Sequence, residues 1–222
     1  RLRSGALVVG RGREAAVQPP YAPWAEVLSA IRRTTPQTDR TWHELPHLVP
    51  AFAASDRPAP GSRVGSKDML LVEISEYVRT AARDRLLVIV LDDVQWADSA
   101  SWDMLEFLVG QLGSEHLLIC LTIRAEEMQG ETLERRRRLS RNERFRELTL
   151  SRLTREELKQ WLQAAFHRQE IGRELLAFLY HHTEGNPLFV VQVLRTLVEA
   201  GGTVSDTAPS YGASEEVAGR LA

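Results

Sequence analysis

The sequence predicts an α/β fold, in which a parallel sheet is followed by a small unit made of helices. Two predominantly apolar runs, at 86–91 and 117–123, have the length of strands. A stretch with helical spacing of apolar residues lies between them. Such a strand–helix–strand unit has parallel strands and a right-handed crossover. From residue 151 onward the spacing of apolar residues is helical throughout.

Length and composition narrow the class of protein. A chain of 222 residues suits one domain of ordinary size or two small ones. Its 43% hydrophobic and 26% charged residues are typical of a globular protein. The net charge of -2 gives no electrostatic reason to expect nucleic acid or acidic lipid as a direct partner.

The cysteine content predicts a cellular compartment, and the chain ends predict that the sequence is a piece of a longer protein. Cys120 is the single cysteine, which excludes an internal disulfide, and its apolar neighbours predict a buried, inert thiol. No apolar run approaches the ~20 residues that span a bilayer, and no signal peptide is found. We therefore expect a cytoplasmic protein with no membrane partner. Because the sequence opens on Arg1 and ends inside a predicted helix, we expect a piece of a longer protein.

The first elements follow from apolar spacing and turn residues. A short strand is expected at 6–10, and a Pro-rich turn at 19–23 leads into a helix. A Pro-, Gly- and Ser-rich stretch at 54–66 predicts a surface loop before a second helix. The apolar residues at helical spacing are Trp24, Val27, Leu28 and Ile31 in the first helix, and Leu70, Ile74, Tyr77, Val78 and Ala81 in the second.

Two carboxylates, Asp92 and Asp93, directly follow the apolar run 86–91. A continuous apolar run is typical of a strand buried on both faces, and open parallel sheets bind ligands at the carboxyl ends of their strands. Asp92 is the candidate magnesium ligand, acting through a water molecule. Asp93 is the candidate base or water-orienting group for hydrolysis. The alternative is that two acids merely close a strand at the surface.

Arg124 ends the second apolar run. Because both strands end at one edge of the sheet, we expect Asp92, Asp93 and Arg124 to face a single crevice. An arginine suits recognition of phosphate, since its planar fork stays charged and binds oxyanions bidentately. The alternative is a structural ion pair with one of the two acids, and the two interpretations are compatible.

The following segments are predicted from caps and charges. Asp98 or Ser99 can cap a helix between the two apolar runs. The charged run 134–138 is bracketed by glutamates and predicts a solvated helix face. A last, short strand is expected at 146–150. The expected apolar face of the capped helix consists of Trp102, Leu105, Phe107, Leu108 and Leu112.

The C-terminal part predicts three helices. A capping box begins at Thr154, and a second helix stops near Gly185. Asn186 is then the expected N-cap and Pro187 the first residue of the third helix. A helix N-terminus can bind an anion, although a plain helix–helix turn is the better explanation of these residues taken alone. The expected apolar face of the third helix is Leu188, Val191, Leu194 and Val198.

A phosphate-binding loop is missing from the sequence. The nearest segment, 61–68, has Ser66 where the motif needs a glycine and Asp68 where it needs a hydroxyl. It also follows a Pro-rich loop and not a strand, so we reject it. The six histidines show no metal-ligand spacing with acids or cysteine.

The segment 91–98, Leu-Asp-Asp-Val-Gln-Trp-Ala-Asp, closely resembles the Walker B segment of signal-transduction ATPases of the AAA/STAND type. These ATPases occur in large LuxR-type transcriptional regulators and beside some bacterial adenylate cyclases and serine/threonine kinases. Three further segments resemble the family in the right order. They are the turn at 20–24, the sensor-1 strand at 121–124 and the lid motif at 183–189.

The resemblance implies a P-loop-NTPase-like core over 1–150, beginning with the second strand, and a helical lid over 151–222 that runs into a truncated following domain. It implies ATP or ADP and Mg2+ as cofactors, with Asp92 on the magnesium side and Asp93 as the catalytic acid. Arg124 would be the sensor, and the lid motif with Asn186 and Pro187 would bind nucleotide, with Pro187 near adenine. The P-loop and the first strand would precede Arg1.

The function that follows is an ATP-binding and ATP-hydrolysing molecular switch in a bacterial signalling protein or transcriptional regulator. ATP with Mg2+ would close core and lid, and hydrolysis would let them part. Its partners would be the nucleotide and effector domains in the same longer chain, with self-association as a further option. The alternative is a catalytically inactive pseudo-ATPase that serves as an interaction or scaffold module. A domain that binds DNA directly is disfavoured by the near-neutral charge.

Overall fold

The computed structural model of the chain describes residues 5–14, 19–34, 41–52, 66–111, 113, 115–167 and 169–199. The chain divides into two compact units, Arg1–Arg146 and Glu147–Ala222, and each is considered by itself. The first unit holds the sheet with its helices, and the second contains helices. The mixed α/β fold class predicted from the sequence is confirmed.

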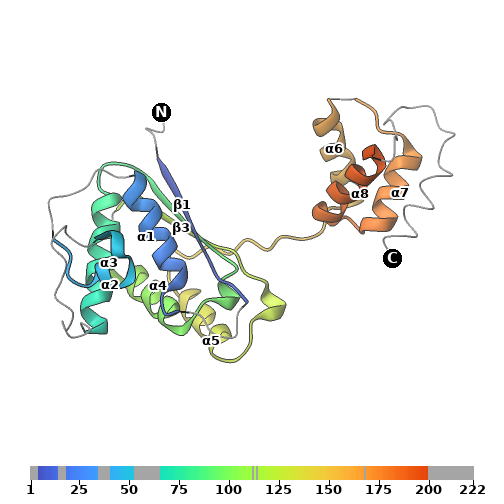
Figure 1. Ribbon diagram of the computed structural model, residues 1–222. Coiled ribbons are helices and arrows are strands. Elements are labelled where there is room, and N and C mark those ends of the chain that lie inside the picture. Colours follow the sequence, from blue (N-terminus) through green and yellow to red (C-terminus); the bar gives the residue numbers. More distant parts are fainter. Residues whose placement is uncertain are drawn as a thin grey trace. The chain divides into compact units, whose positions relative to one another are not determined.

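The sheet has three parallel strands in the order β1-β2-β3 (Figure 1). The strands are β1 (Ala6–Arg11), β2 (Leu87–Asp92) and β3 (Leu117–Leu121). All three were predicted, and the parallel pairing of β2 with β3 was expected from the helix between them. Because the three strands are parallel, their carboxyl ends lie at one edge of the sheet.

In the described residues of the first unit, five helices accompany the sheet, together with three short 3-10 turns. The three longest helices were predicted from apolar spacing, and all of them reach the hydrophobic core. The helices are α1 (Ala22–Thr34), α2 (Leu45–Leu48), α3 (Lys67–Ala81), α4 (Ser99–Gln111) and α5 (Gly130–Leu139). The 3-10 turns are Pro50–Phe52, Val94–Trp96 and Ala125–Glu127.

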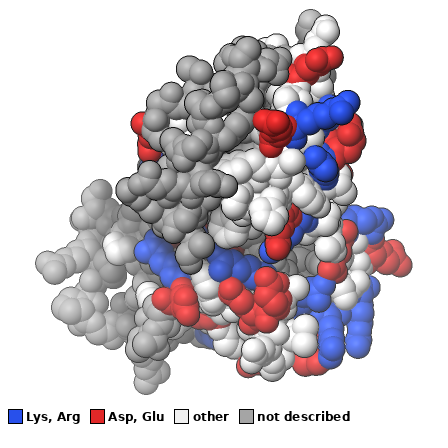
Figure 2. Space-filling model, turned by 90° about the vertical axis from the view of Figure 1, so that its right-hand side faces the viewer, with Lys and Arg blue, Asp and Glu red and all other residues white. Residues whose placement is uncertain are grey.

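The charged run 134–138 lies in α5, and the prediction of a fully solvated helix face is wrong for one residue. Arg135 is buried. Its charge is compensated there, since its guanidinium lies 2.6 Å from both Asp103 Oδ1 and Glu131 Oε1 and also donates to Ser99 Oγ. Asp103 also pairs with Lys67, so this cluster joins α3, α4 and α5. Elsewhere basic and acidic side chains are interspersed on the face shown in Figure 2.

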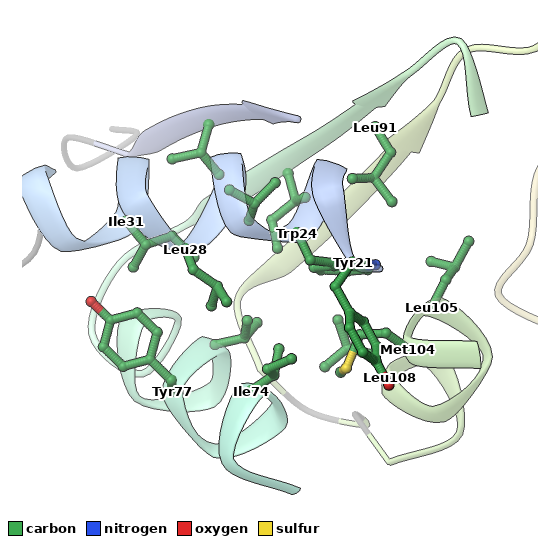
Figure 3. Packing of buried hydrophobic residues seen from close by; sticks show 14 of the residues in the cluster. Tyr21, Trp24, Leu28, Ile31, Ile74, Tyr77, Leu91, Met104, Leu105 and Leu108 are labelled. Carbon is green, nitrogen blue, oxygen red and sulfur yellow. The ribbon is translucent and has the colours of Figure 1, made fainter. Parts of the chain in front are cut away.

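The core lies between one face of the sheet and helices α1, α3 and α4. In Figure 3 the apolar side chains of these three helices point toward one another beneath the strands. Trp24, Leu28 and Ile31 of α1 are completely buried, as the sequence predicted. Burial of a side chain of this size stabilises a fold by about 1.5–3 kcal/mol. The Nε1 of Trp24 also donates to the carbonyl of Ser101, which fixes α1 to the start of α4.

The second face of the sheet departs from the prediction that its strands are buried on both faces. Burial alternates along β1 and β2, and Leu7 and Leu118 on the second face are 65% and 50% exposed. Cys120 shares this face and is a half-buried free thiol, not a buried one. An apolar run shows which side chains can be buried, whereas actual burial depends on helices that lie over the face. Among the described residues, such helices cover the first face.

One acidic cap ties the start of α4 to the turn before α1. Asp98 is the N-cap, because its Oδ1 accepts from the backbone N–H of Ser101 at 2.9 Å and its Oδ2 accepts from the hydroxyl. The same Oδ1 accepts from the backbone N–H of Tyr21, whose φ of 62° is in the left-handed region. The Pro-rich turn at 19–23 is therefore held directly against the segment that follows β2.

The segment 146–150 has no strand structure, so the prediction of a last short strand is wrong. Leu148 and Leu150 alternate with polar residues as a strand would, but they are 87% and 90% exposed. Alternation alone cannot make a strand without a partner strand and a covered face. The predicted loop at 54–66 falls outside the described residues except for Ser66, which is the N-cap of α3.

The part of the second unit that the structure describes contains three helices around a small core of its own. Thr154 and Glu157 form the predicted capping box at the start of α6. Leu153 N–H donates to the carbonyl of Gly185, which has a φ of 76° and no room for a Cβ. The helices are α6 (Arg155–Phe166), α7 (Arg173–Thr183) and α8 (Pro187–Glu199), and their buried core is Leu158, Leu162, Ile171, Leu176, Leu179 and Val190.

Helix α8 starts where the sequence predicted but packs with a different face. Leu188, Val191 and Val198 were expected to be buried, yet they are 71%, 43% and 58% exposed. Val190 is buried instead and Val193 packs beside it, as does Leu194, which is the member of the expected face that contacts this core. Apolar residues occur on nearly every side of this helix, so helical spacing cannot select one face. No helix of the described part is both long and apolar enough to cross a membrane.

Candidate functional site

The three strands end in a row of polar side chains at the carboxyl edge of the sheet. Arg11 is the register partner of Asp92, and Leu91 is the partner of Leu121, which precedes Thr122. Register partners on neighbouring strands point to the same face of a sheet, and so do residues two positions apart in one strand. Arg11, Asp92 and Thr122 therefore lie on the second face of the sheet. The row Arg11–Asp92–Thr122 thus ends the apolar surface formed by the residues before it.

Asp92 lies at the centre of this row. Thr122 Oγ1 donates to Asp92 Oδ1 at 2.6 Å, and Arg11 Nε lies 3.7 Å from Asp92 Oδ2. The Asp92 side chain is 39% exposed, so solvent and small ligands reach it. One oxygen is therefore held by a short hydrogen bond, and the other only by a long ion pair.

Asp93 turns the chain sharply away from the sheet. Its φ of 52° and ψ of 49° are in the left-handed region, which non-glycine residues adopt at a cost. The turn is stabilised because Asp93 N–H donates to Thr122 Oγ1 at 2.8 Å. Its carboxylate then points toward Gln95 and Arg124, with Oδ1 at 3.0 Å from Gln95 Nε2 and 3.6 Å from Arg124 Nε. The strain is thus located at a predicted site residue.

Arg124 lies beside Asp93, as expected from the parallel arrangement of β2 and β3. Its Nη1 donates to Glu127 Oε1 at 3.0 Å, and the guanidinium carbon lies 5.0 Å from the ring centroid of Trp96. The hydrogen bond with Glu127 raises the pKa of Arg124, so the side chain stays charged. Because the side chain is 52% exposed, it can exchange these partners for a ligand.

The Gln95 side chain links the segment after β2 to the segment after β3. It is buried, and its Nε2 donates to Asp93 Oδ1 at 3.0 Å and to Glu127 Oε2 at 3.3 Å. Its Oε1 accepts from the backbone N–H of Arg124 at 3.2 Å. One amide side chain therefore fixes a carboxylate after β2 and the backbone after β3 at the same time.

The comparison with protein-family models identifies the first unit. The model of the AAA ATPase domain matches residues 1–120, which is more than half of the chain. The chain belongs to the AAA ATPase domain family. Asp92 and Asp93 fall inside the matched residues, and the family indicates a nucleotide-dependent activity. In a comparison with curated proteins, none matched this chain.

AAA ATPase domains generally bind a nucleotide with Mg2+, and the residues present in this AAA domain fit that ion. No group of three or more His, Cys, Asp or Glu that could hold a metal occurs among the described residues, which excludes there a cage made of protein ligands alone. Magnesium usually keeps several waters and takes one or two carboxylates together with phosphate oxygens. The exposed carboxylate of Asp92, whose Oδ2 is loosely held, can accept from a magnesium-bound water.

The remaining two candidate residues lie in the second unit, and like Arg124 they are outside the residues matched by the AAA model. Asn186 is the N-cap of α8, since its Oδ1 accepts from Leu188 N–H at 3.0 Å, and Pro187 is the first helical residue. Pro187 is exposed, and Phe189 is 52% exposed. The predicted geometry of this turn is confirmed, whereas its role toward a nucleotide stays a prediction.

Arg11, Gln95 and Thr122 were not assigned a role from the sequence. Thr122 and Arg11 carry a recognisable signal, because each is at a polar position that continues the same-face alternation at the end of an apolar run. Gln95 carries a weaker signal. It is a polar residue that is buried because its amide is hydrogen-bonded to three polar groups. Sequence spacing does not reveal these partners.

Proposed function

We propose that this chain is part of an ATP-binding and ATP-hydrolysing molecular switch, in a cytoplasmic bacterial signalling protein or a LuxR-type transcriptional regulator of the STAND class. The proposal is supported by the position of Asp92 and Asp93 at the end of β2, inside the residues matched by the AAA model, and by the ion pair of Asp93 with Arg124 after β3. Ligands of open parallel sheets bind at this edge. The regulator context rests on the resemblance of 91–98 and 183–189 to that class.

Each side chain of the site has a role in this mechanism. Mg2+ bound with the nucleotide would neutralise charge on the phosphate oxygens. Asp92 would accept from a magnesium-bound water, and Thr122 would keep its carboxylate in one orientation. Asp93 would orient the attacking water or take its proton, with Gln95 fixing the position of its oxygens. Arg124 would exchange its carboxylate partners for phosphate, which its planar guanidinium group can bind bidentately.

The second unit would supply contacts to the rest of the nucleotide. We assign Asn186 and Pro187 to this contact, in agreement with the exposed N-terminus of α8. The positive dipole end of a helix N-terminus favours anions, and exposed Pro187 and Phe189 offer an apolar surface for a base. Effector domains in the same longer chain would respond to the change between the ATP-bound and ADP-bound states.

The test is a measurement of radiolabelled ATP binding and turnover by the protein produced from its own gene. Asp92→Ala should abolish turnover, and Asp93→Asn should retain binding while turnover falls at least about 100-fold, as expected for a general base. Asp84→Ala is the matched control, because Asp84 is an exposed acid in the loop before β2. Turnover unchanged in Asp92→Ala would refute the role of Asp92.

A second candidate function is a catalytically inactive pseudo-ATPase that serves as an interaction or scaffold module. It is favoured by one observation, since Asp93 and Glu127 already hold Arg124 in ion pairs. This candidate predicts no ATP turnover, and Asp93→Asn should then have no effect on any measured rate. A basal turnover that depends on Asp93 would exclude it.

A further inference from the structure

Two arginines follow one another closely at the end of β1, and they have different partners. Arg13 Nη2 lies 2.7 Å from Glu26 Oε1, which compensates its charge. Arg11 uses only its backbone N–H toward Glu26, at 3.2 Å from Oε2. Among the described residues, Asp92 is the carboxylate that the Arg11 side chain faces, at 3.7 Å. Of the two arginines at the end of β1, Arg11 is therefore the one whose side chain pairs with Asp92.

The backbone keeps Arg11 at this place. Arg11 and Asp92 are register partners in the β1–β2 ladder, so their side chains leave the sheet on the same face. Directly afterwards, Gly12 N–H donates to the carbonyl of Asp92 at 2.8 Å. A Cβ on Gly12 would lie only 2.3 Å from the carbonyl oxygen of Asp93, so only glycine allows the two chains to approach so closely. The end of β1 is thus fixed against the acid pair.

The two oxygens of Asp92 are held with different strength. Oδ1 accepts the 2.6 Å hydrogen bond from Thr122, whereas Oδ2 has the 3.7 Å ion pair with Arg11. A contact of this length between side chains that are 61% and 39% exposed contributes little free energy and is easily exchanged. A hydrated magnesium ion and a guanidinium would compete for the same oxygen, because each is a cation that donates hydrogen bonds.

We propose that Arg11 is a positioning residue that sets the cation affinity of Asp92. Arg11 holds Asp92 Oδ2 while no cation is bound, gives this oxygen up when hydrated Mg2+ binds, and then binds phosphate oxygens that accompany the ion. The inference rests on the proposed function, since it takes Asp92 as the carboxylate of the cation site. It assigns to Arg11 opposite effects on the cation alone and on the cation with phosphate.

The test uses the 15N-labelled full chain and Mn2+, whose unpaired electrons broaden amide signals near the bound ion. The signals of Gly12, Asp93 and Thr122 should broaden at lower Mn2+ concentration than other signals. Arg11→Gln should lower the midpoint concentration about two- to fivefold, the range expected from loss of a weak ion pair. Arg11→Lys retains the charge and should resemble the wild type.

Arg13→Gln is the matched control, because it removes the same charge two residues away and leaves the Asp92 ion pair intact. Equal shifts for Arg11→Gln and Arg13→Gln would overturn the inference. With Mn2+ and inorganic tripolyphosphate together, Arg11→Gln should instead weaken binding relative to the wild type. If Arg11→Gln bound Mn2+ more tightly than the wild type in both experiments, the proposal that Arg11 moves to the phosphate oxygens would be overturned.

Asp92→Asn separates this inference from the function on which it rests. If the broadening of Gly12, Asp93 and Thr122 signals persists in Asp92→Asn, or if Mn2+ does not broaden them in the wild type, the proposed cation site is wrong and the inference falls with it. If Asp92→Asn abolishes the broadening but Arg11→Gln and Arg13→Gln behave alike, the cation site stands and only the inference on Arg11 fails.

Discussion

Thr122 Oγ1 donates a 2.6 Å hydrogen bond to Asp92 Oδ1 and accepts one from Asp93 N–H at 2.8 Å. A single hydroxyl on the residue after β3 therefore orients both members of the acid pair after β2. It fixes one carboxylate directly and the other through the backbone of a left-handed residue. Preorganisation of this kind keeps a carboxylate in place before a ligand arrives.

Replacement of Thr122 by valine should remove both hydrogen bonds with little change in volume. We expect the free energy of unfolding to fall by about 1 kcal/mol, because one of the two bonds is to a charged group but the site is exposed. Urea unfolding measures this value. Thr122→Ser keeps the hydroxyl and should stay within about 0.5 kcal/mol of the wild type. A valine variant as stable as the serine variant would contradict the assignment.

Replacement of Gln95 by leucine should leave three polar groups without their buried partner. The groups are the carboxylates of Asp93 and Glu127 and the backbone N–H of Arg124. We expect a loss of about 1–3 kcal/mol in urea unfolding, which is the cost of unpaired polar groups. Gln129→Leu is the control at an exposed position and should change stability by less than about 0.5 kcal/mol. Similar losses in both variants would contradict this account.

Asp103 should make the stability of the first unit depend on pH. Burial raises the pKa of Asp103, but hydrogen bonds from Lys67 and Arg135 outweigh it, so the pKa lies below its usual value. A carboxyl whose pKa is lower in the folded than in the unfolded state stabilises the fold above the unfolded pKa of about 3.9. This stabilisation is lost as the pH falls below that value toward the folded pKa.

Asp103→Asn should therefore lower the free energy of unfolding at pH 7 by about 1–2 kcal/mol, and the difference from the wild type should vanish in acid. Urea unfolding at a series of pH values measures it. Asp84→Asn is the control, since Asp84 is exposed in the loop before β2. A difference that stays constant from pH 7 to pH 3 would show that the ion pairs of Asp103 are not its cause.

The packing of α1 on the sheet should be sensitive to a cavity. Leu28→Ala removes a completely buried side chain, and such changes cost about 2–5 kcal/mol. Leu148→Ala is the matched control, because Leu148 is 87% exposed and its truncation should cost less than about 0.5 kcal/mol. The two midpoints of thermal unfolding should differ clearly, and equal midpoints would contradict the assigned core.

The elements that the sequence predicted correctly are those with one clear period. The apolar runs of β2 and β3 and the spacing of Trp24, Leu28 and Ile31 each fit a single type of structure. The side on which Asp93 and Arg124 meet followed from strand direction alone.

The errors have a common physical origin in contacts between distant segments. Arg135 is buried because Asp103 of α4 compensates its charge, and spacing within α5 does not reveal that. Segment 146–150 lacks a partner strand, and α8 has apolar residues on too many sides to select one. Gln95 and Thr122 likewise act through partners some thirty positions away in the sequence.

The most direct test of the central claim, that Asp92 holds the cation of a bound nucleotide, is calorimetry of ATP binding with Mg2+ and with a chelator. The protein produced from its own gene should bind ATP at least about tenfold more tightly with Mg2+, which corresponds to about 1.4 kcal/mol. In Asp92→Asn this gain should disappear, while the affinity measured in chelator stays the same. An equal gain from Mg2+ in both proteins would contradict the account.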